Sequence, residues 1–164
     1  MAAFLRRSGR VEGVVLENGE RALASAASAA GSVVATDRRL LVPTADGYHS
    51  IGWDRVDRAA WDGDAEVLVV AESAPLGSPR RDHRLRVEDP RRLLDVVREQ
   101  VTASVVLTRH VPIDGSLGVR VTGRRRRDGI TWLVAVDEGL RLEDPAIRRL
   151  VDAAVASVRA EVEP

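Results

Sequence analysis

The chain has 164 residues, 45% of them hydrophobic and 30% charged, which is typical of one folded domain and excludes a disordered chain. Its 25 basic and 25 acidic residues cancel, which argues against a general polyanion binder, and every basic residue is arginine. Cysteine is absent, which excludes disulfides, thiol nucleophiles and cysteine-ligated metals. Residues 1–16 show no apolar signal-peptide core, so we expect a cytoplasmic protein.

The first half of the chain predicts a series of short strands. Turn signals that contain Gly, Pro or Asp recur about every 8–12 residues, which favours a β-barrel or sandwich. In the last of these strands His83, Leu85 and Val87 alternate with two arginines, so they should share one face. The predicted strands cover residues 20–27, 32–36, 40–44, 48–53, 58–61, 66–72 and 83–87.

A helix is predicted to follow this strand series. Asp89 is a suitable N-cap, and Pro90 stands at the first helical position, where its missing N–H costs nothing. Apolar residues then recur at helical spacing, which should let the helix close the strand series. These residues are Leu93, Leu94, Val97 and Val101.

The second half predicts a strand over 105–113, a hairpin formed by 119–127 and 130–136, and a helix from about Asp144 to Arg159. The helix has a regular apolar stripe: Ile147, Leu150, Val151, Ala154, Val155 and Val158. We therefore predict an α+β fold, mainly β, with two parts. Residues 10–104 form an antiparallel barrel, closed or nearly closed and capped by a helix, and residues 105–164 form a β-hairpin–helix extension that packs on the barrel or on a second copy.

Two blocks of the first half carry a family resemblance. VVATDRRLLVP (33–43) followed by SIGWDRVDRAAW (50–61) resembles the pattern of bacterial PH-like domains of the PH and GRAM type, and also a group of proteins from high-GC bacteria with the same ATDRRLL and WDRV blocks. The resemblance covers roughly residues 10–104. It implies two nearly orthogonal sheets capped by a helix. Some members of such families bind phosphoinositides or peptides, and many have no known ligand.

The residues themselves disfavour a phosphoinositide site. Members that bind such lipids place several basic residues in the first hairpins, whereas residues 11–35 contain one arginine, Arg21, and three glutamates. Arg38 and Arg39 follow one turn later, beside Asp37. We therefore do not expect a membrane partner.

The most unusual segment is the arginine run in VTGRRRRDGITW (121–132). Asp128-Gly129 is a strong hairpin signal, and a two-residue type I′ loop there would pair Arg127 with Ile130 and Arg125 with Trp132. Arg120 would then face Asp137 across the strands. This register splits the four arginines over two faces of the hairpin. The run would then form a solvated hairpin tip that resists edge-to-edge aggregation.

Because a nucleic-acid groove binder needs its cations on one surface, the split predicts that the run is no nucleic-acid site. Replacing all four arginines with Gln should leave weak DNA retention unchanged. The alternative function is an anion-binding module that uses these arginines to bind nucleic acid or acidic lipid. The residues that could contact a partner are Arg38, Arg39, Arg124, Arg125, Arg126, Arg127 and Trp132.

No pattern in the sequence indicates catalysis, a cofactor or a metal site. His49, His83 and His110 fall in separate predicted strands without metal-ligand spacing, so we expect three isolated surface histidines. Trp53 is expected to lie in the core, whereas the sequence does not determine whether Trp61 is buried or exposed. The function we predict is a non-catalytic binding or scaffold module that acts through protein contacts or self-association.

Overall fold

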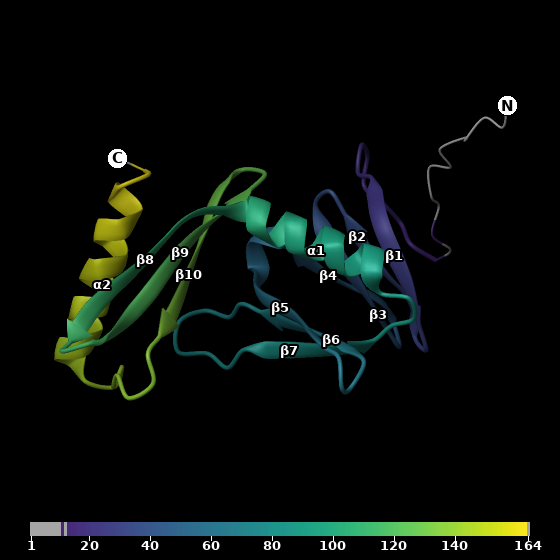
Figure 1. Cartoon of the computed structure of the whole chain (residues 1–164). Coiled ribbons are helices and arrows are strands. Elements are labelled where there is room, and N and C mark those ends of the chain that lie inside the picture. The colour runs from purple at the N-terminus through teal and green to yellow at the C-terminus, as the bar shows by residue number, and fades with distance from the viewer. Residues whose placement is uncertain (1–10, 12, 164) are drawn as a thin grey trace, which may run out of the picture.

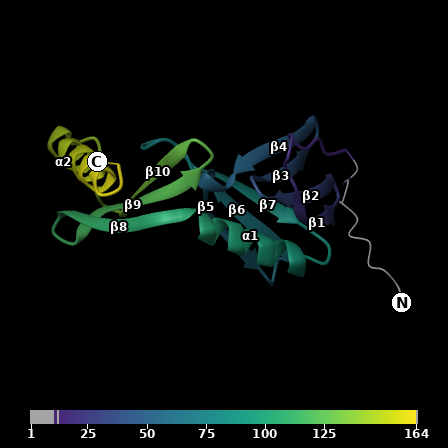
Figure 2. The ribbon, with the colours of Figure 1, turned by 90° about the horizontal axis from the view of Figure 1, so that it is seen from above.

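The computed structural model describes residue 11 and residues 13–163. Residues 1–10, 12 and 164 lie outside the described part. Most of segment 1–16, for which the sequence predicts no signal-peptide core, therefore falls outside it. The described chain is elongated: one end holds strands β1–β7 with helix α1, and the other holds β8–β10 with helix α2 (Figures 1 and 2).

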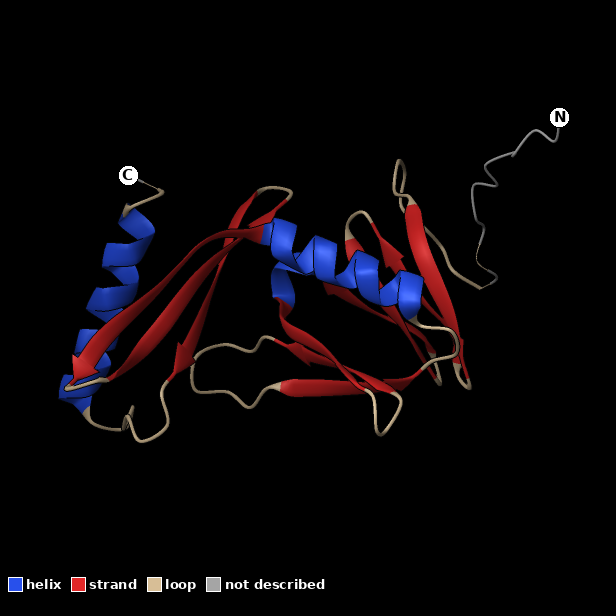
Figure 3. Ribbon diagram, in the orientation of Figure 1, coloured by secondary structure: helices blue, strands red, loops and turns tan. Residues whose placement is uncertain are grey.

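In the described residues the fold is α+β and mainly β, as the sequence predicts, with three antiparallel meanders and two α-helices. Figure 3 shows how strands and helices are distributed. The first sheet contains β1 (Ala22–Ser28), β2 (Gly31–Thr36), β3 (Arg39–Thr44) and β4 (Gly47–Gly52). The second contains β5 (Val56–Asp62), β6 (Val67–Glu72) and β7 (Arg81–Arg86). The third contains β8 (Val105–Asp114), β9 (Leu117–Arg126) and β10 (Gly129–Val136). The helices are η1 (Trp53–Arg55, 3₁₀), α1 (Arg91–Ser104) and α2 (Pro145–Ala160).

The first two sheets do not close into a barrel within the described residues, which corrects the sequence prediction. The chain passes from β4 to β5 through the 3₁₀-helix η1, so these two strands are not hydrogen-bonded neighbours. On the other side, one backbone hydrogen bond, from Glu88 N–H to Ala27 O at 2.9 Å, joins the end of β7 to β1. The two sheets therefore pack face to face around a shared core and are joined at their corners without a continuous ladder.

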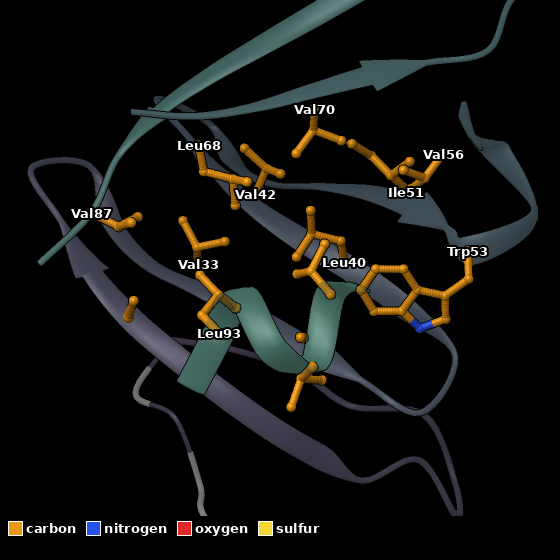
Figure 4. Close-up of a cluster of buried hydrophobic side chains, with 14 residues drawn as sticks. Val33, Leu40, Val42, Ile51, Trp53, Val56, Leu68, Val70, Val87 and Leu93 are labelled. Carbon is orange, nitrogen blue, oxygen red and sulfur yellow. The ribbon is translucent and has the colours of Figure 1, made fainter. Parts of the chain in front are cut away.

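The larger hydrophobic core lies between these two sheets and α1 (Figure 4). Both sheets contribute fully buried side chains, among them Val33, Leu40 and Leu68, and α1 contributes Leu93 and Val97. Trp53 is 5% exposed, so the expectation that it belongs to the core is confirmed, whereas Trp61 is partly buried at the margin. Alternating strand residues thus face one core, as the period of the strands requires.

The ATDRRLL and WDRV blocks meet at one buried residue, Thr36. Its hydroxyl accepts hydrogen bonds from the backbone N–H groups of Arg38 and Arg39 at 3.1 and 2.9 Å, which shapes the turn between β2 and β3. Its carbonyl accepts a hydrogen bond from the Trp53 indole N–H at 2.9 Å. The two blocks therefore form one structural joint, in which the turn positions Arg38 and Arg39 beside η1.

Helix α1 presents the predicted apolar stripe to the core but begins differently from the prediction. Pro90 is the N-cap residue, and no side chain caps the helix. Asp89 has φ +43°, a left-handed conformation that directs the chain from β7 into the helix. The prediction of Asp89 as N-cap was therefore wrong, whereas the buried positions Leu93 and Val97 were predicted correctly.

The C-terminal helix begins and ends close to the predicted positions. Asp144 is the N-cap, and its carboxylate accepts a hydrogen bond from Ala146 N–H at 2.8 Å. The apolar stripe packs on β9 and forms a second hydrophobic core, in which Val151 is fully buried. Leu150 departs from the predicted stripe, since it is 51% exposed. Within the described residues, neither α-helix is long and apolar enough to cross a membrane.

The β9–β10 hairpin has a register two residues away from the predicted one. Arg126 pairs with Gly129 and Arg125 with Ile130, so the loop residues are Arg127 and Asp128. Gly129, with φ +136°, takes the conformation that favours glycine. Because a shift of two keeps the alternation of faces, the predicted face of each residue is right but its cross-strand partner is wrong. Asp137, predicted to face Arg120, instead accepts hydrogen bonds from His110 and Gly118 N–H.

Candidate functional site

A groove of about 640 Å³ lies where the tip of the β9–β10 hairpin meets the first sheet, η1 and the C-terminal end of α1. It brings together segments that are about ninety residues apart in the sequence. Five of the seven predicted contact residues line it, and all five are arginines. The lining consists of Glu17, Asp37, Arg38, Arg39, Ser50, Gly52, Trp53, Asp54, Gln100, Ala103, Ser104, Arg125, Arg126, Arg127 and Asp128.

Two of the groove arginines are held by carboxylates of their own chain. Arg38 donates to Glu17 Oε2 and to the Asn18 carbonyl, both at 3.1 Å. Arg39 donates from Nε and Nη2 to the two oxygens of Glu20, both at 2.9 Å, which is the strong bidentate arrangement. These two arginines therefore contribute shape and polarity to the wall of the groove but little uncompensated charge.

The Arg39–Glu20 pair is a largely buried ion pair that stabilises this wall of the groove. The Glu20 side chain is fully buried, and it also accepts hydrogen bonds from the Thr36 hydroxyl and from Glu17 N–H. The hydrogen bond from Arg39 is the largest cause that lowers the pKa of Glu20, which falls to about 2 although burial opposes the shift. The carboxylate is therefore ionised throughout the neutral range.

Glu20→Gln is expected to remove a pH-dependent part of the stability. The carboxyl pKa is about 2 in the folded chain and about 4.5 in an ordinary glutamate, so the folded state binds the proton more weakly. The stabilisation, roughly 3 kcal/mol, is present above about pH 4.5 and is lost as the pH falls toward 2. Urea unfolding across this range should show the wild-type advantage shrinking as the pH falls.

The matched control is Glu17→Gln, three residues away, because the Glu17 side chain is 56% exposed. That variant should follow the pH profile of the wild-type protein. A difference between wild type and Glu20→Gln that stays constant from pH 5 to pH 2 would contradict the ionic role of Glu20.

The three arginines at the hairpin tip are the uncompensated charges of the groove. Arg125, Arg126 and Arg127 are exposed, and among the described residues none of them forms an ion pair or a side-chain hydrogen bond. All three line the same groove, because they lie at the tip, where the two faces of the hairpin meet. The split of the run over two faces of the hairpin therefore does not keep these three arginines out of one groove.

Arg124, the first arginine of the run, lies inside the protein at the joint between the two cores and is 6% exposed. Its Nη1 donates to Val101 O at 3.0 Å and to Ser104 Oγ at 2.8 Å, and its Nη2 donates to Asp57 O at 3.2 Å. Burial lowers the pKa of its guanidinium, although Asp57 and Asp54 raise it. Arg124 therefore holds β9 against the end of α1, and its expected role as a partner contact is corrected.

Trp132, the seventh predicted contact residue, belongs to the second core and not to the groove. It lies opposite Gly123, where an added Cβ would come within 3.0 Å of the indole, so the glycine makes room for the ring. Its N–H donates to Glu163 at 3.0 Å, and the guanidinium carbon of Arg159 lies 6.0 Å from the ring centroid. The predicted contact with Arg125 is replaced by this one with Arg159.

The structure also brings together residues that the sequence left separate. His49 of β4 and His83 of β7 both place Nε2 on Glu72 Oε2 of β6, at 2.9 and 2.8 Å. Burial raises the pKa of Glu72, but the hydrogen bonds from His83 and His49 lower it more, and the result is below its ordinary value. His110 pairs with Asp137 at 2.8 Å. The expectation of three isolated histidines was therefore wrong.

A signal for this cluster exists in the strand alternation. His49, Glu72 and His83 each lie two residues from an inward-facing core residue, namely Ile51, Val70 and Leu85. The alternation places the three side chains on inner faces, but it does not tell which strand ends meet.

No protein-family model, no curated protein and no solved structure matches this chain.

Proposed function

We propose that the protein is a non-catalytic binding module of PH-like architecture that holds an acidic segment of a protein partner in the arginine-lined groove. The observation that carries the proposal is the convergence of Arg125, Arg126 and Arg127 on one groove without internal partners among the described residues. The PH-like part is supported by a four-stranded meander, a three-stranded meander and a helix that share one core.

A carboxylate is the ligand that suits these three arginines. The planar guanidinium group offers paired N–H donors that match the two oxygens of a carboxylate. Arg38 and Arg39 are already occupied by Glu17 and Glu20, so an incoming carboxylate would meet the hairpin tip first. The hairpin tip therefore provides the recognition, and the wall formed by the β2–β3 turn provides the shape.

A protein segment fits the groove better than a nucleic acid does. Four carboxylates, those of Glu17, Asp37, Asp54 and Asp128, line the same groove, so its uncompensated positive charge is confined to the hairpin tip and does not form the continuous basic track that a phosphate backbone needs. A peptide alternates acceptors with backbone N–H donors, so it can use both signs of charge.

The expected result is that fluorescein-labelled decaglutamate binds the wild-type protein and binds the Arg125→Gln/Arg126→Gln/Arg127→Gln variant at least tenfold more weakly. Each partly exposed charge pair contributes about 0.5 kcal/mol, and three such pairs correspond to about a factor of ten in the dissociation constant. Fluorescence anisotropy measures both affinities, and binding should weaken as salt is added because the charges are exposed.

Three other arginines serve as the matched control. Arg86, Arg91 and Arg92 are exposed, lie outside the groove and form no ion pair within the described part of the chain. Their triple Gln variant has the same net charge as the groove variant and should keep wild-type affinity. Equal losses in both variants would show a nonspecific charge effect and would contradict the groove.

Duplex DNA and phosphatidylserine vesicles form the competing arms of the same assay. If either binds more tightly than decaglutamate, and the groove variant abolishes that binding, the anion-binding alternative replaces the acidic-peptide proposal. A nucleic-acid site would also show a steep linear fall of log affinity with log salt, with a slope of nearly one unit per phosphate contact.

A further inference from the structure

A second site, independent of the groove, lies at the open corner between the first two sheets. The side chains of His49, Glu72 and His83 come from three different strands, and their ligand atoms lie within 4.8 Å of one another. The two imidazole rings are stacked, with centroids 5.2 Å apart and an interplanar angle of 25°. Both Nε2 atoms are directed at the same carboxylate oxygen, so three potential ligands converge on one point.

One side of the cluster is buried against the core, and the other side is exposed to solvent. The side chains of His83, Glu72 and His49 are 13%, 17% and 31% exposed, respectively. Behind them lies the larger core, which contains Ile51 and Val70, each two residues along the same strand from His49 and Glu72, respectively. Such a position offers three protein ligands from the walls and leaves a further coordination position for water on the exposed side.

We propose that His49, Glu72 and His83 bind one Zn²⁺ ion, which links the edge strand β4 of the first sheet to β6 and β7 of the second. Two imidazole nitrogens with one carboxylate oxygen suit zinc, whereas Mg²⁺ and Ca²⁺ prefer oxygen ligands throughout. Zinc with three protein ligands and an open fourth position is a common arrangement in proteins.

The distances agree with such an ion after a small adjustment. Zinc ligands about 2.0–2.2 Å from the metal stand roughly 3.3 Å apart in a tetrahedron. The two Nε2–Oε2 distances are 2.8 and 2.9 Å, so each ring must withdraw by about half an ångström. His49 lies on the exposed side, where its ring can move without disturbing the core.

The site is distinct from the arginine groove although both use β4. Ser50 lines the groove, and its neighbour His49 belongs to the cluster. Adjacent residues of a strand face opposite sides, so the two sites lie on opposite faces of the same strand. Zinc at this corner would strengthen a junction at which the two sheets share no continuous ladder.

Isothermal titration calorimetry with ZnCl₂ tests the proposal, with any polyhistidine tag removed. The wild-type protein is expected to bind one Zn²⁺ per chain, and His49→Gln and His83→Gln should each weaken binding by at least about a hundredfold. Zn²⁺ should also raise the Tm of the wild-type protein but not of these variants, because only a ligand of the folded state stabilises it.

Two further variants keep the test decisive. Glu72→Gln keeps a hydrogen-bond acceptor for the histidines and removes the anionic ligand, so it should remain folded and lose Zn²⁺ binding. His110→Gln removes the third histidine, which has a carboxylate at the same distance but no second imidazole beside it, and should bind Zn²⁺ as the wild type does. No saturable binding by the wild type, equal binding by His83→Gln, or equal loss in His110→Gln would overturn the proposal.

Discussion

Val151→Asp is expected to lower the free energy of unfolding by about 3–5 kcal/mol, because it places an unpaired carboxylate in a packed apolar face. Val151 is fully buried between α2 and the β8–β10 sheet, where it belongs to the same cluster as Val119 and Val121 of β9. Urea unfolding followed by circular dichroism measures the loss.

The neighbouring position provides the control. Leu150 is 51% exposed on the same helix, so Leu150→Asp introduces the same charge without burying it and should change stability by less than about 1 kcal/mol. Trp132 reports on the second core and Trp53 on the first, so single-tryptophan versions of Val151→Asp would show which core is lost first. Equal stability of the two Asp variants would mean that the stripe of α2 is not packed.

The second large effect is expected from Arg124→Glu, again about 3–5 kcal/mol. Arg124 supplies hydrogen bonds to Val101 O and Ser104 Oγ, at the C-terminal end of α1, where the helix dipole favours a cation. A carboxylate there would lie beside the carbonyl oxygens of Val101 and Asp57 and would be buried without a cationic partner. Thermal and urea unfolding should both show the loss.

Two substitutions separate charge from shape at this joint. Arg124→Met keeps the apolar stem and removes the donors, so it should cost less than Arg124→Glu, since no new charge is buried. Arg126→Glu, two residues along the same strand but exposed, should change stability little. If Arg124→Glu and Arg126→Glu unfold at the same denaturant concentration, the buried contacts of Arg124 do not hold the two cores together.

Much of the fold follows from alternation and helical spacing. The strands around Leu40 and Leu68 and the helix that begins after Asp144 were predictable, because each has a buried face with the period of its element. The failure of the first two sheets to close into a barrel was not predictable, because it depends on how η1 turns the chain between β4 and β5. The left-handed conformation of Asp89 likewise comes from the tertiary path and not from its residue type.

The hairpin register shows a further limit of local signals. Asp128-Gly129 favours a two-residue turn at those positions, but the real pairing places Gly123 opposite Trp132. That pairing relieves the crowding that any larger side chain would meet against the indole. Packing of the second core therefore determines the register, and a turn signal alone does not contain that information.

The candidate site was predictable as a set of arginines but not as a geometry. Arg38, Arg39 and the arginines of the hairpin tip were identified from the sequence, and the structure joins them in one groove. These residues are far apart in the sequence, so their proximity could not be predicted. The same holds for the contact between His49 and His83. Arg124 could not be distinguished from its three neighbours, because its burial depends on the contact of β9 with α1.

The most direct test of the groove is an NMR titration of ¹⁵N-labelled protein with decaglutamate. We predict that amide shift changes concentrate at residues 125–128, 37–39 and 52–54, and that they disappear when Arg125, Arg126 and Arg127 are replaced by Gln. Changes spread over exposed arginines outside the groove, such as Arg86 and Arg91, or no changes at all, would contradict the proposed binding site.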